Sequence, residues 1–214
     1  MNEQEFIKAI EDLGLTITLD QQKKLELVYN TLIETNTKMN LTRITAKEDV
    51  YLKHFYDSLT IVKIADLSKV NTLCDIGSGA GFPGIILKIF YDNLDITLID
   101  ALNKRVVYLN NLIEKLNLKN IRAYHMRAED LIRKHKTFDL VTARAVAALP
   151  KLLPWAMPLV NTHGSFIAMK GNVLDELNDA KKLMIKKKWY LNSQVTFSLP
   201  HDAGIRTLLE LKKK

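Results

Sequence analysis

The residues best suited to chemistry lie in one glycine-rich segment, LCDIGSGAGFPG, at positions 73–84. Gly77, Gly79 and Gly81 follow an apolar run that is typical of a β-strand, and a run of helical character comes after them. Glycines at such a turn let the backbone bend sharply and approach a ligand without Cβ atoms in the way. Because open α/β sheets bind ligands beyond the carboxyl ends of their strands, this spacing predicts a ligand-binding loop.

Asp100 narrows the class of ligand that the loop would hold. It ends the next apolar run, 23 residues after Gly77, where a carboxylate can accept two hydrogen bonds from a ribose. The glycine loop and Asp100 together predict a cofactor that contains adenosine.

Two adenosine cofactors are compatible with this loop. Gly79, Gly81 and Gly84 also match the GxGxxG pattern of dinucleotide sites, so an NAD-dependent oxidoreductase is one alternative. Asp75 favours the other, because a carboxylate ahead of the glycines would repel an anionic pyrophosphate but not a cationic sulfonium. We therefore expect S-adenosyl-L-methionine and include Asp75 among the residues that bind it. A Walker loop is excluded because no GK[ST] follows.

Residues 1–66 have the apolar spacing of helices. Phe55, Leu59 and Val62 recur at steps of four and three, and an earlier apolar stripe ends at the polar stretch 34–40. That earlier stripe predicts a helix of about five turns followed by a loop. The sequence therefore predicts an N-terminal helical extension.

From residue 67 the pattern changes to short apolar runs that alternate with segments of helical length. Runs that are apolar on both faces predict a parallel sheet covered by helices on both sides. The last two runs, joined by a short loop, predict an antiparallel pair at one edge. The expected fold class is α/β, with residues 67–214 as the cofactor-binding domain, packed with the extension as one unit. The seven runs are 72–76, 96–99, 121–126, 138–142, 166–169, 195–199 and 207–211.

The composition excludes several classes of protein. With 47% hydrophobic and 26% charged residues, the 214-residue chain can bury a core, which argues against disorder. It has one cysteine and no CxxC or HExxH pair, so neither an internal disulfide nor a metal site is predicted. The acidic start argues against a signal peptide, and Pro154 and Pro158 interrupt the one long uncharged run. We expect a cytoplasmic protein without a membrane partner.

Positive charge is concentrated in the second part of the chain. The formal net charge is +7, but residues 1–66 carry 8 basic and 11 acidic groups, whereas residues 67–169 carry 13 and 8. Residues 170–214 carry 10 basic and 5 acidic groups. This balance suits a polyanionic partner that approaches the cofactor-binding domain. It also allows a second alternative function, a non-catalytic RNA-binding module.

Seven short motifs are spread along the chain: MNLTRI (39–44), HFYDSL (54–59), DIGSGAGFPGI (75–85), KR (104–105), RAED (127–130), TARAVA (142–147) and MKG (169–171). Together they resemble the RsmG family, also called GidB. The resemblance implies a class I, Rossmann-like S-adenosylmethionine-dependent methyltransferase with a seven-stranded, mostly parallel sheet and an N-terminal helical extension. It further implies transfer of a methyl group to N7 of a guanine in 16S ribosomal RNA, with that RNA or the small ribosomal subunit as partner. No obligate protein partner is evident.

The resemblance also implies the residues of the cofactor site. They come from the glycine loop and from the ends of the second, third and fourth strands, and Asp100 is expected beside the ribose. No role is assigned to His125. The implied residues are Gly77, Phe82, Asp100, Ala128, Glu129 and Arg144.

The type of acceptor atom can be argued from what the chain lacks. After the fourth strand it carries TARAVA, without the Asn or Asp, prolines and aromatic residue common in exocyclic-amine methyltransferases. Cys74 lies inside the first strand and is expected in the core, so the nucleophile for pyrimidine C5 chemistry is missing. The class of acceptor that remains is an atom with a free lone pair, such as guanine N7, whose methylation needs no general base. We therefore expect no acid or base residue.

Several polar residues could position the RNA. Arg144 and Asn40 are candidates for positioning at the reaction centre, although Asn40 could equally cap the helix that follows it. His54 and Asp57 are expected to form a structural hydrogen-bonded pair. Four basic residues are candidate contacts to RNA, with ordinary surface charge as the alternative: Arg43, Lys104, Arg105 and Lys170.

Overall fold

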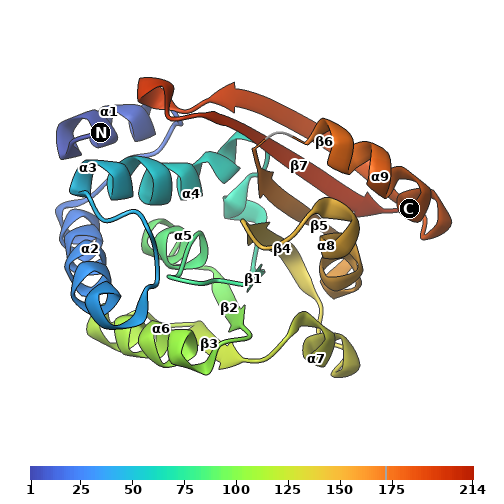
Figure 1. Cartoon of the computed structure of the whole chain (residues 1–214), viewed down its shortest axis with the longest axis horizontal. Helices are drawn as coiled ribbons and strands as arrows, with labels where there is room; N and C mark the ends of the chain where they lie inside the picture. Colours follow the sequence, from blue (N-terminus) through green and yellow to red (C-terminus); the bar gives the residue numbers. More distant parts are fainter. Residues whose placement is uncertain (172) are drawn as a thin grey trace.

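The computed structural model describes residues 1–171 and 173–214, and its centre is a seven-stranded sheet (Figure 1). Its strands are β1 (Thr72–Ile76), β2 (Asp95–Asp100), β3 (Ile121–His125), β4 (Phe138–Arg144), β5 (Val160–Lys170), β6 (Trp189–Ser198) and β7 (Ile205–Lys213). They are arranged in the order β3-β2-β1-β4-β5-β7-β6. β1 to β5 are parallel, whereas β7 is antiparallel to both β5 and β6. The predicted fold class and the antiparallel pair at one edge are confirmed.

Successive residues of the parallel strands point to opposite faces of the sheet, and both faces are covered by helices. Leu73 and Leu98 lie in one apolar core, whereas Cys74 and Val141 lie in the other. Cys74 is thus a buried core residue, as predicted. The first core is covered by α5 (Gly84–Phe90) and α6 (Asn103–Lys115), and the second by α7 (Ala128–Arg133), α8 (Leu149–Ala156) and α9 (Leu174–Lys186).

The N-terminal extension begins with two capped helices, α1 (Glu3–Glu11) and α2 (Leu19–Met39). In each, the side chain of the N-cap residue accepts the backbone N–H three residues later, and the Glu or Gln side chain at that later position accepts the N–H of the N-cap residue. The sequence predicts a loop from residue 34, but α2 continues to Met39, so that prediction is wrong. Polar residues do not end a helix by themselves, and α2 ends at Asn40, whose φ of 49° is left-handed.

The rest of the extension is a chain of short helical turns. α3 (Lys47–Val50) leads into a π-helical turn (Tyr51–Tyr56), followed by α4 (Asp57–Leu59) and two 3₁₀ turns (Thr60–Lys63 and Leu67–Lys69). The predicted stripe of Phe55 and Leu59 is buried. A π-helical turn is rare and is found mostly at functional sites.

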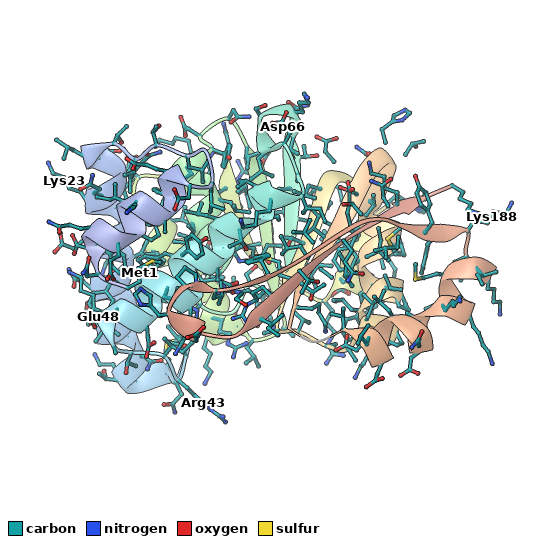
Figure 2. The ribbon with its side chains drawn as sticks, turned by 90° about the horizontal axis from the view of Figure 1, so that it is seen from above. Met1, Lys23, Arg43, Glu48, Asp66 and Lys188 are labelled. Carbon is teal, nitrogen blue, oxygen red and sulfur yellow. The ribbon has the colours of Figure 1, made fainter. Side chains whose placement is uncertain are left out.

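Charged side chains lie around the edge of the molecule (Figure 2). Lys23 and Arg43 of the extension and Lys188 after α9 are among them, and each is labelled in that view. Within the two described ranges, no helix is long and apolar enough to cross a membrane.

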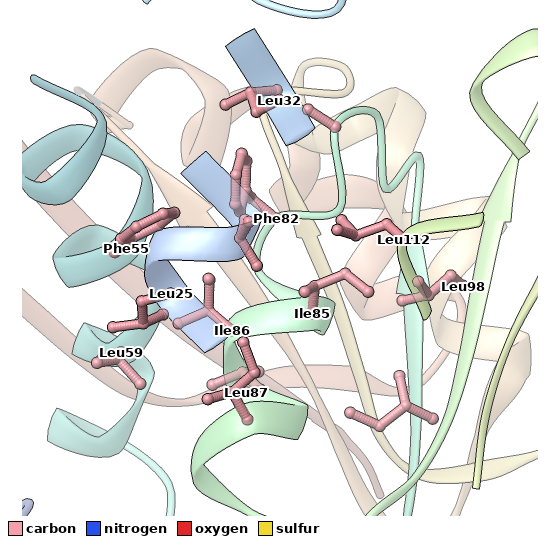
Figure 3. Packing of buried hydrophobic residues seen from close by; sticks show 14 of the residues in the cluster. Leu25, Leu32, Phe55, Leu59, Phe82, Ile85, Ile86, Leu87, Leu98 and Leu112 are labelled. Atoms are coloured by element: carbon pink, nitrogen blue, oxygen red, sulfur yellow. The ribbon is translucent and has the colours of Figure 1, made fainter. Parts of the chain in front are cut away.

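The extension and the sheet share one hydrophobic core. Leu25 and Phe55 belong to the same buried cluster as Ile85 of α5 and Leu98 of β2 (Figure 3). Phe55 is completely buried, and its ring lies 6.0 Å from that of Phe82 in the glycine loop. The extension therefore buries apolar surface directly against the elements that carry the loop.

This shared core predicts that the extension and the sheet unfold together. Phe55→Ala should lower the free energy of unfolding by about 3–5 kcal/mol, because it leaves a cavity in the common core. Both tryptophans, Trp155 and Trp189, lie in residues 67–214, so their fluorescence in a urea titration reports the sheet half alone.

The expected result is a lower urea midpoint in both tryptophan fluorescence and far-ultraviolet circular dichroism. Leu27→Ala, at a side chain of α2 that is 36% exposed, is the control and should shift neither midpoint by much. A fluorescence midpoint that stays unchanged in Phe55→Ala would show that the extension is an independent unit.

Candidate functional site

The glycine loop follows β1 and has the backbone geometry that only glycine adopts readily. Gly77, Gly79 and Gly81 have φ angles of 68°, 58° and 99°, all in the left-handed region. The Gly79 N–H donates to Asp100 Oδ2 at 2.9 Å, which fixes the loop against the end of β2. The glycine loop and Asp100, which the sequence predicts to serve one ligand, are therefore in contact, although Gly79 and Asp100 are 21 residues apart in the chain.

Asp75 lies beneath this loop and is completely buried. Its Oδ2 accepts the Gly84 N–H at 3.0 Å, whereas its Oδ1 has no hydrogen-bond partner among the described residues. Burial raises the pKa of the Asp75 carboxyl to about 7. A Cβ at Gly84 would lie 2.3 Å from Leu98, so this third glycine of the GxGxxG pattern is needed for close packing. Its N–H faces Asp75, where a pyrophosphate would meet a carboxylate.

A cavity of about 250 Å³ opens at the carboxyl ends of β1 to β3. Four predicted cofactor residues line it: Gly77, Asp100, Ala128 and Glu129. No ligand role was predicted for the other lining residues. Ile76, Arg127 and Val146 fall inside quoted motifs but were not singled out, and the remaining positions lie outside every motif. The missed lining residues are Ile76, Ile99, Ala101, Met126, Arg127, Val146 and Trp155.

Asp100 is the polar centre of this first cavity. Besides Gly79, its carboxylate accepts the Leu102 N–H at 2.9 Å and lies 3.4 Å from Arg105 Nη1. Arg105 was expected to contact RNA, but in the structure it pairs with Asp100 at the proposed cofactor site. His125 has its Nε2 3.1 Å from the carbonyl oxygen of Ala101, beside the same cavity.

A second cavity, of about 360 Å³, lies on the other side of the segment that follows β4. Arg144 and Ala145 line this second cavity, whereas Val146 lines the first. The segment 144–146 thus contributes lining residues to both cavities. Other residues of the second cavity come from the extension, β5, α9 and β7: Ile44, Lys53, His54, Asp57, Met169, Lys170, Gly171, Glu176 and Arg206.

Arg144 is held in the second cavity by an ion-pair cluster. Its Nη1 donates to Asp57 Oδ2 at 2.9 Å and to the carbonyl oxygen of Lys53, in the π-helical turn, at 3.2 Å. The other carboxylate oxygen of Asp57 accepts from Arg206 Nε at 2.8 Å. The Asp57 side chain is only 2% exposed, so both guanidinium groups are needed to compensate its buried charge.

His54 completes the support of Arg144. Arg144 Nη2 lies 3.3 Å from His54 Nδ1, and since a guanidinium can only donate, Nδ1 accepts. The ring proton is therefore on Nε2, which donates to Thr42 Oγ1 at 2.9 Å. Burial, and then the charge of Arg144, lower the pKa of His54 to about 3, so the ring is neutral. The imidazole also stacks on Phe82 with 4.6 Å between ring centroids.

The prediction of a hydrogen bond between His54 and Asp57 is wrong. In the described structure both side chains bind Arg144 instead of each other. A spacing of three residues brings side chains together in an α-helix, but His54 lies in the π-helical turn and Asp57 after it. The guanidinium of Arg144, at the end of β4, binds both side chains. Local spacing in the sequence cannot predict these contacts.

Other predicted residues lie near the cavities without lining the first one. Phe82 is buried, and its ring faces His54 and the Arg144 guanidinium. Asn40 ends the preceding helix α2 with a left-handed backbone, whereas Ala46 is the N-cap of α3, so the expected cap of the following helix is wrong. Lys170 Nζ donates to the Ala147 carbonyl and pairs with Glu176 at 2.8 Å each. Lys104 is exposed at the start of α6 and Arg43 on the loop after α2.

The residues present fit S-adenosylmethionine. Asp100 and Glu129 offer carboxylates at the first cavity for a ribose, and Met126 and Trp155 offer apolar surface for an adenine. The unpartnered Oδ1 of Asp75, under the glycine loop, suits a cationic ligand. The role of each residue as a ligand stays a prediction.

Comparisons with known proteins give a consistent family. The model of the family GidB, described as rRNA small subunit methyltransferase G, matches residues 21–203. Ribosomal RNA small subunit methyltransferase G of Bacillus pumilus (strain SAFR-032) is 43% identical over 218 residues, covering 100% of this chain and 91% of the relative. The protein of the same name from Macrococcus caseolyticus (strain JCSC5402) is 42% identical over 217 residues, with the same coverage.

A solved structure supports the fold alone. The ribosomal protein L11 methylase from Lactobacillus delbrueckii subsp. bulgaricus superimposes with a TM-score of 0.58 at 18% sequence identity. The similarity covers 76% of this chain and 79% of that chain.

The buried carboxyl of Asp75 predicts a pH dependence of stability. With a pKa near 7 in the folded chain and an ordinary value near 4 when unfolded, Asp75 keeps a proton between about pH 4 and pH 7 only in the folded state. A rise in pH through this range therefore destabilises the protein. Asp75→Asn removes the titration but keeps an oxygen for the Gly84 N–H.

The measurement is urea denaturation of both proteins at pH 5 and pH 8. The difference in free energy of unfolding, variant minus parent, should be roughly 2–3 kcal/mol larger at pH 8 than at pH 5. An equal difference at the two pH values would mean that Asp75 does not titrate in this range.

Proposed function

The chain belongs to the GidB family of rRNA small subunit methyltransferase G proteins, and on this premise we propose that it methylates N7 of a guanine in 16S ribosomal RNA. The methyl donor is S-adenosyl-L-methionine. The substrate is the RNA or the small ribosomal subunit that contains it, which makes the cytoplasm the site of action.

The observation that carries the proposal is the pair of cavities on the two sides of the β4 exit. The first suits an adenosyl group, and the second, larger and lined with basic side chains, suits a nucleotide. Consecutive residues of one segment line both: Arg144 and Ala145 line the second, and Val146 lines the first. This shared segment supports binding of a donor and an acceptor next to each other, as methyl transfer needs.

The side chains around the second cavity support attack by an atom that is already nucleophilic. His54 is neutral with both ring nitrogens engaged, and Asp57 is paired with two guanidinium groups, so neither is free to remove a proton. Guanine N7 has a free lone pair and needs no base. The N7 lone pair bonds to the methyl carbon while the carbon–sulfur electrons leave with sulfur, and the positive charge moves to the purine.

Each predicted residue then has a proposed task. Gly77, Ala128, Glu129 and Asp100 bind the adenosyl group, Gly79 and Gly81 shape the loop, and Asp75, buried beneath the loop outside both cavities, contributes negative charge toward the cationic donor.

Arg144 lines the acceptor cavity, and its guanidinium lies over the ring of Phe82. Asn40 stays a candidate for positioning the acceptor.

Arg43 and Lys104 are exposed and contact RNA phosphates. Lys170 and Arg105 contact phosphates only if their ion pairs with Glu176 and Asp100 open.

The test is methyl transfer to small subunits taken from cells that lack the modification. Mass-spectrometric mapping should find a single 7-methylguanosine that depends on both the protein and S-adenosylmethionine. Asp100→Asn should weaken binding of S-adenosylhomocysteine by roughly tenfold or more, because the ribose loses a charged acceptor. Asp95→Asn, at the exposed start of β2, is the matched control and should bind normally.

Binding can be followed through Trp155, which lines the first cavity. S-adenosylhomocysteine should change its fluorescence, Trp155→Phe should lose that change, and Trp189→Phe should keep it. Binding of NAD in place of S-adenosylhomocysteine would support the oxidoreductase alternative. RNA binding without methyl transfer would support the non-catalytic one.

A further inference from the structure

Glu176 is a carboxylate of the second cavity with an oxygen to spare. Its Oε2 accepts the Leu149 N–H at 2.7 Å and lies 2.8 Å from Lys170 Nζ. Within residues 1–171 and 173–214, Oε1 makes no hydrogen bond or ion pair, and the side chain is 28% exposed. Two contacts thus fix the carboxylate while one oxygen stays open to a ligand.

Asp57, the other acid of this cavity, has no such freedom. Its two oxygens are occupied by Arg144 and Arg206. Arg144, in turn, uses Nη1 and Nη2 for its contacts in the described structure, and its Nε–H donor has no partner there. Among the carboxylate oxygens of the cavity that the structure describes, Glu176 Oε1 is thus the free one, and it lies in the same cavity as a fixed cationic donor.

This combination matches the hydrogen-bonding edge of guanine. Guanine presents N1–H and an exocyclic amine as adjacent donors and O6 as an acceptor, whereas adenine has no donor at N1. A carboxylate can accept from N1–H and the amine, as acidic side chains do when they read base edges. Glu176 would reject adenine, because the unprotonated N1 would face its negative charge.

We propose that Glu176 is a specificity-determining residue that accepts hydrogen bonds from N1–H and the 2-amino group of the target guanine. The inference rests on the proposed function and adds how the base is recognised. The anchoring of Glu176 to the first turn of α8 and to the end of β5 supports it, because it fixes the carboxylate before any base arrives, as recognition of a base edge requires.

Charge development gives Glu176 an effect on rate as well. Methylation at N7 leaves the purine positively charged, which makes N1–H and the amine stronger hydrogen-bond donors. A carboxylate that accepts from them therefore binds the transition state more strongly than the ground state. The loss of Glu176 should lower kcat more than it raises KM.

The test is a cycle of four reactions that combine Glu176→Gln with a change in the base. Small subunits are reconstituted with 16S rRNA that carries either guanine or inosine at the methylated position, since inosine lacks only the 2-amino group. With guanine, the variant should lose roughly 10- to 100-fold in kcat/KM. The parent should prefer guanine to inosine by roughly tenfold, and the variant should show almost no preference.

The controls separate recognition from structure. Asp175→Asn changes the exposed neighbouring acid on α9 and should keep the parent's rate and preference. Glu176→Asp keeps the charge but withdraws the carboxylate, and it should also lose the preference for guanine. S-adenosylhomocysteine affinity should be unchanged in all variants, because Glu176 does not line the first cavity.

A purely structural Glu176 predicts another pattern. If it only orients Lys170 and Leu149, Glu176→Gln slows guanine and inosine substrates equally, and that result overturns the proposal. Retention of the full guanine preference in Glu176→Asp and Glu176→Gln overturns it as well. Failure of the parent to methylate any guanine in the small subunit refutes the proposed function itself, and the proposal with it.

Discussion

Burial of the Asp57 carboxylate between two guanidinium groups is the interaction on which the arrangement of the site depends. Asp57 comes from the N-terminal extension, Arg144 from the end of β4 and Arg206 from β7. Removing one partner of such a buried cluster costs about 3–5 kcal/mol, because a charge is left uncompensated in a poorly solvated place. The three segments must therefore meet whenever the protein is folded. The helical extension is thus tied to the sheet by charge as well as by apolar packing.

The ion pairs of Asp57 affect the arrangement of both cavities. Arg144 is held on the side of the β4 exit that faces the second cavity, and His54 supports it in a single neutral tautomer. The same imidazole stacks on Phe82, which belongs to the glycine loop. The extension therefore contacts the loop on one side and the β4 exit on the other. We regard it as part of the reaction centre and not as an appendage.

The sequence predicted those features that local patterns determine. The glycine turn after the first strand follows from a short motif, and the seven strands follow from short apolar runs; both agree with the structure. The hydrogen bond from Gly79 to Asp100 was not predicted, although the sequence placed both residues at one ligand site. The pairs Arg144–Asp57 and Arg206–Asp57 join positions 87 and 149 residues apart, and no local pattern marks them. Trp155 was missed for a similar reason, since its place at the first cavity depends on how α8 packs. The π-helical turn at His54 has no sequence signal at all.

The central claim is that Arg144 serves the acceptor cavity, although its motif had suggested the cofactor site. Calorimetric titration of Arg144→Lys with S-adenosylhomocysteine, compared with its rate of methyl transfer to small subunits, tests this most directly. Lysine keeps a positive charge near Asp57, so the fold should survive. We expect an affinity within about twofold of the parent and a rate that falls by roughly 100-fold. A loss of S-adenosylhomocysteine affinity equal to the loss of rate would contradict it.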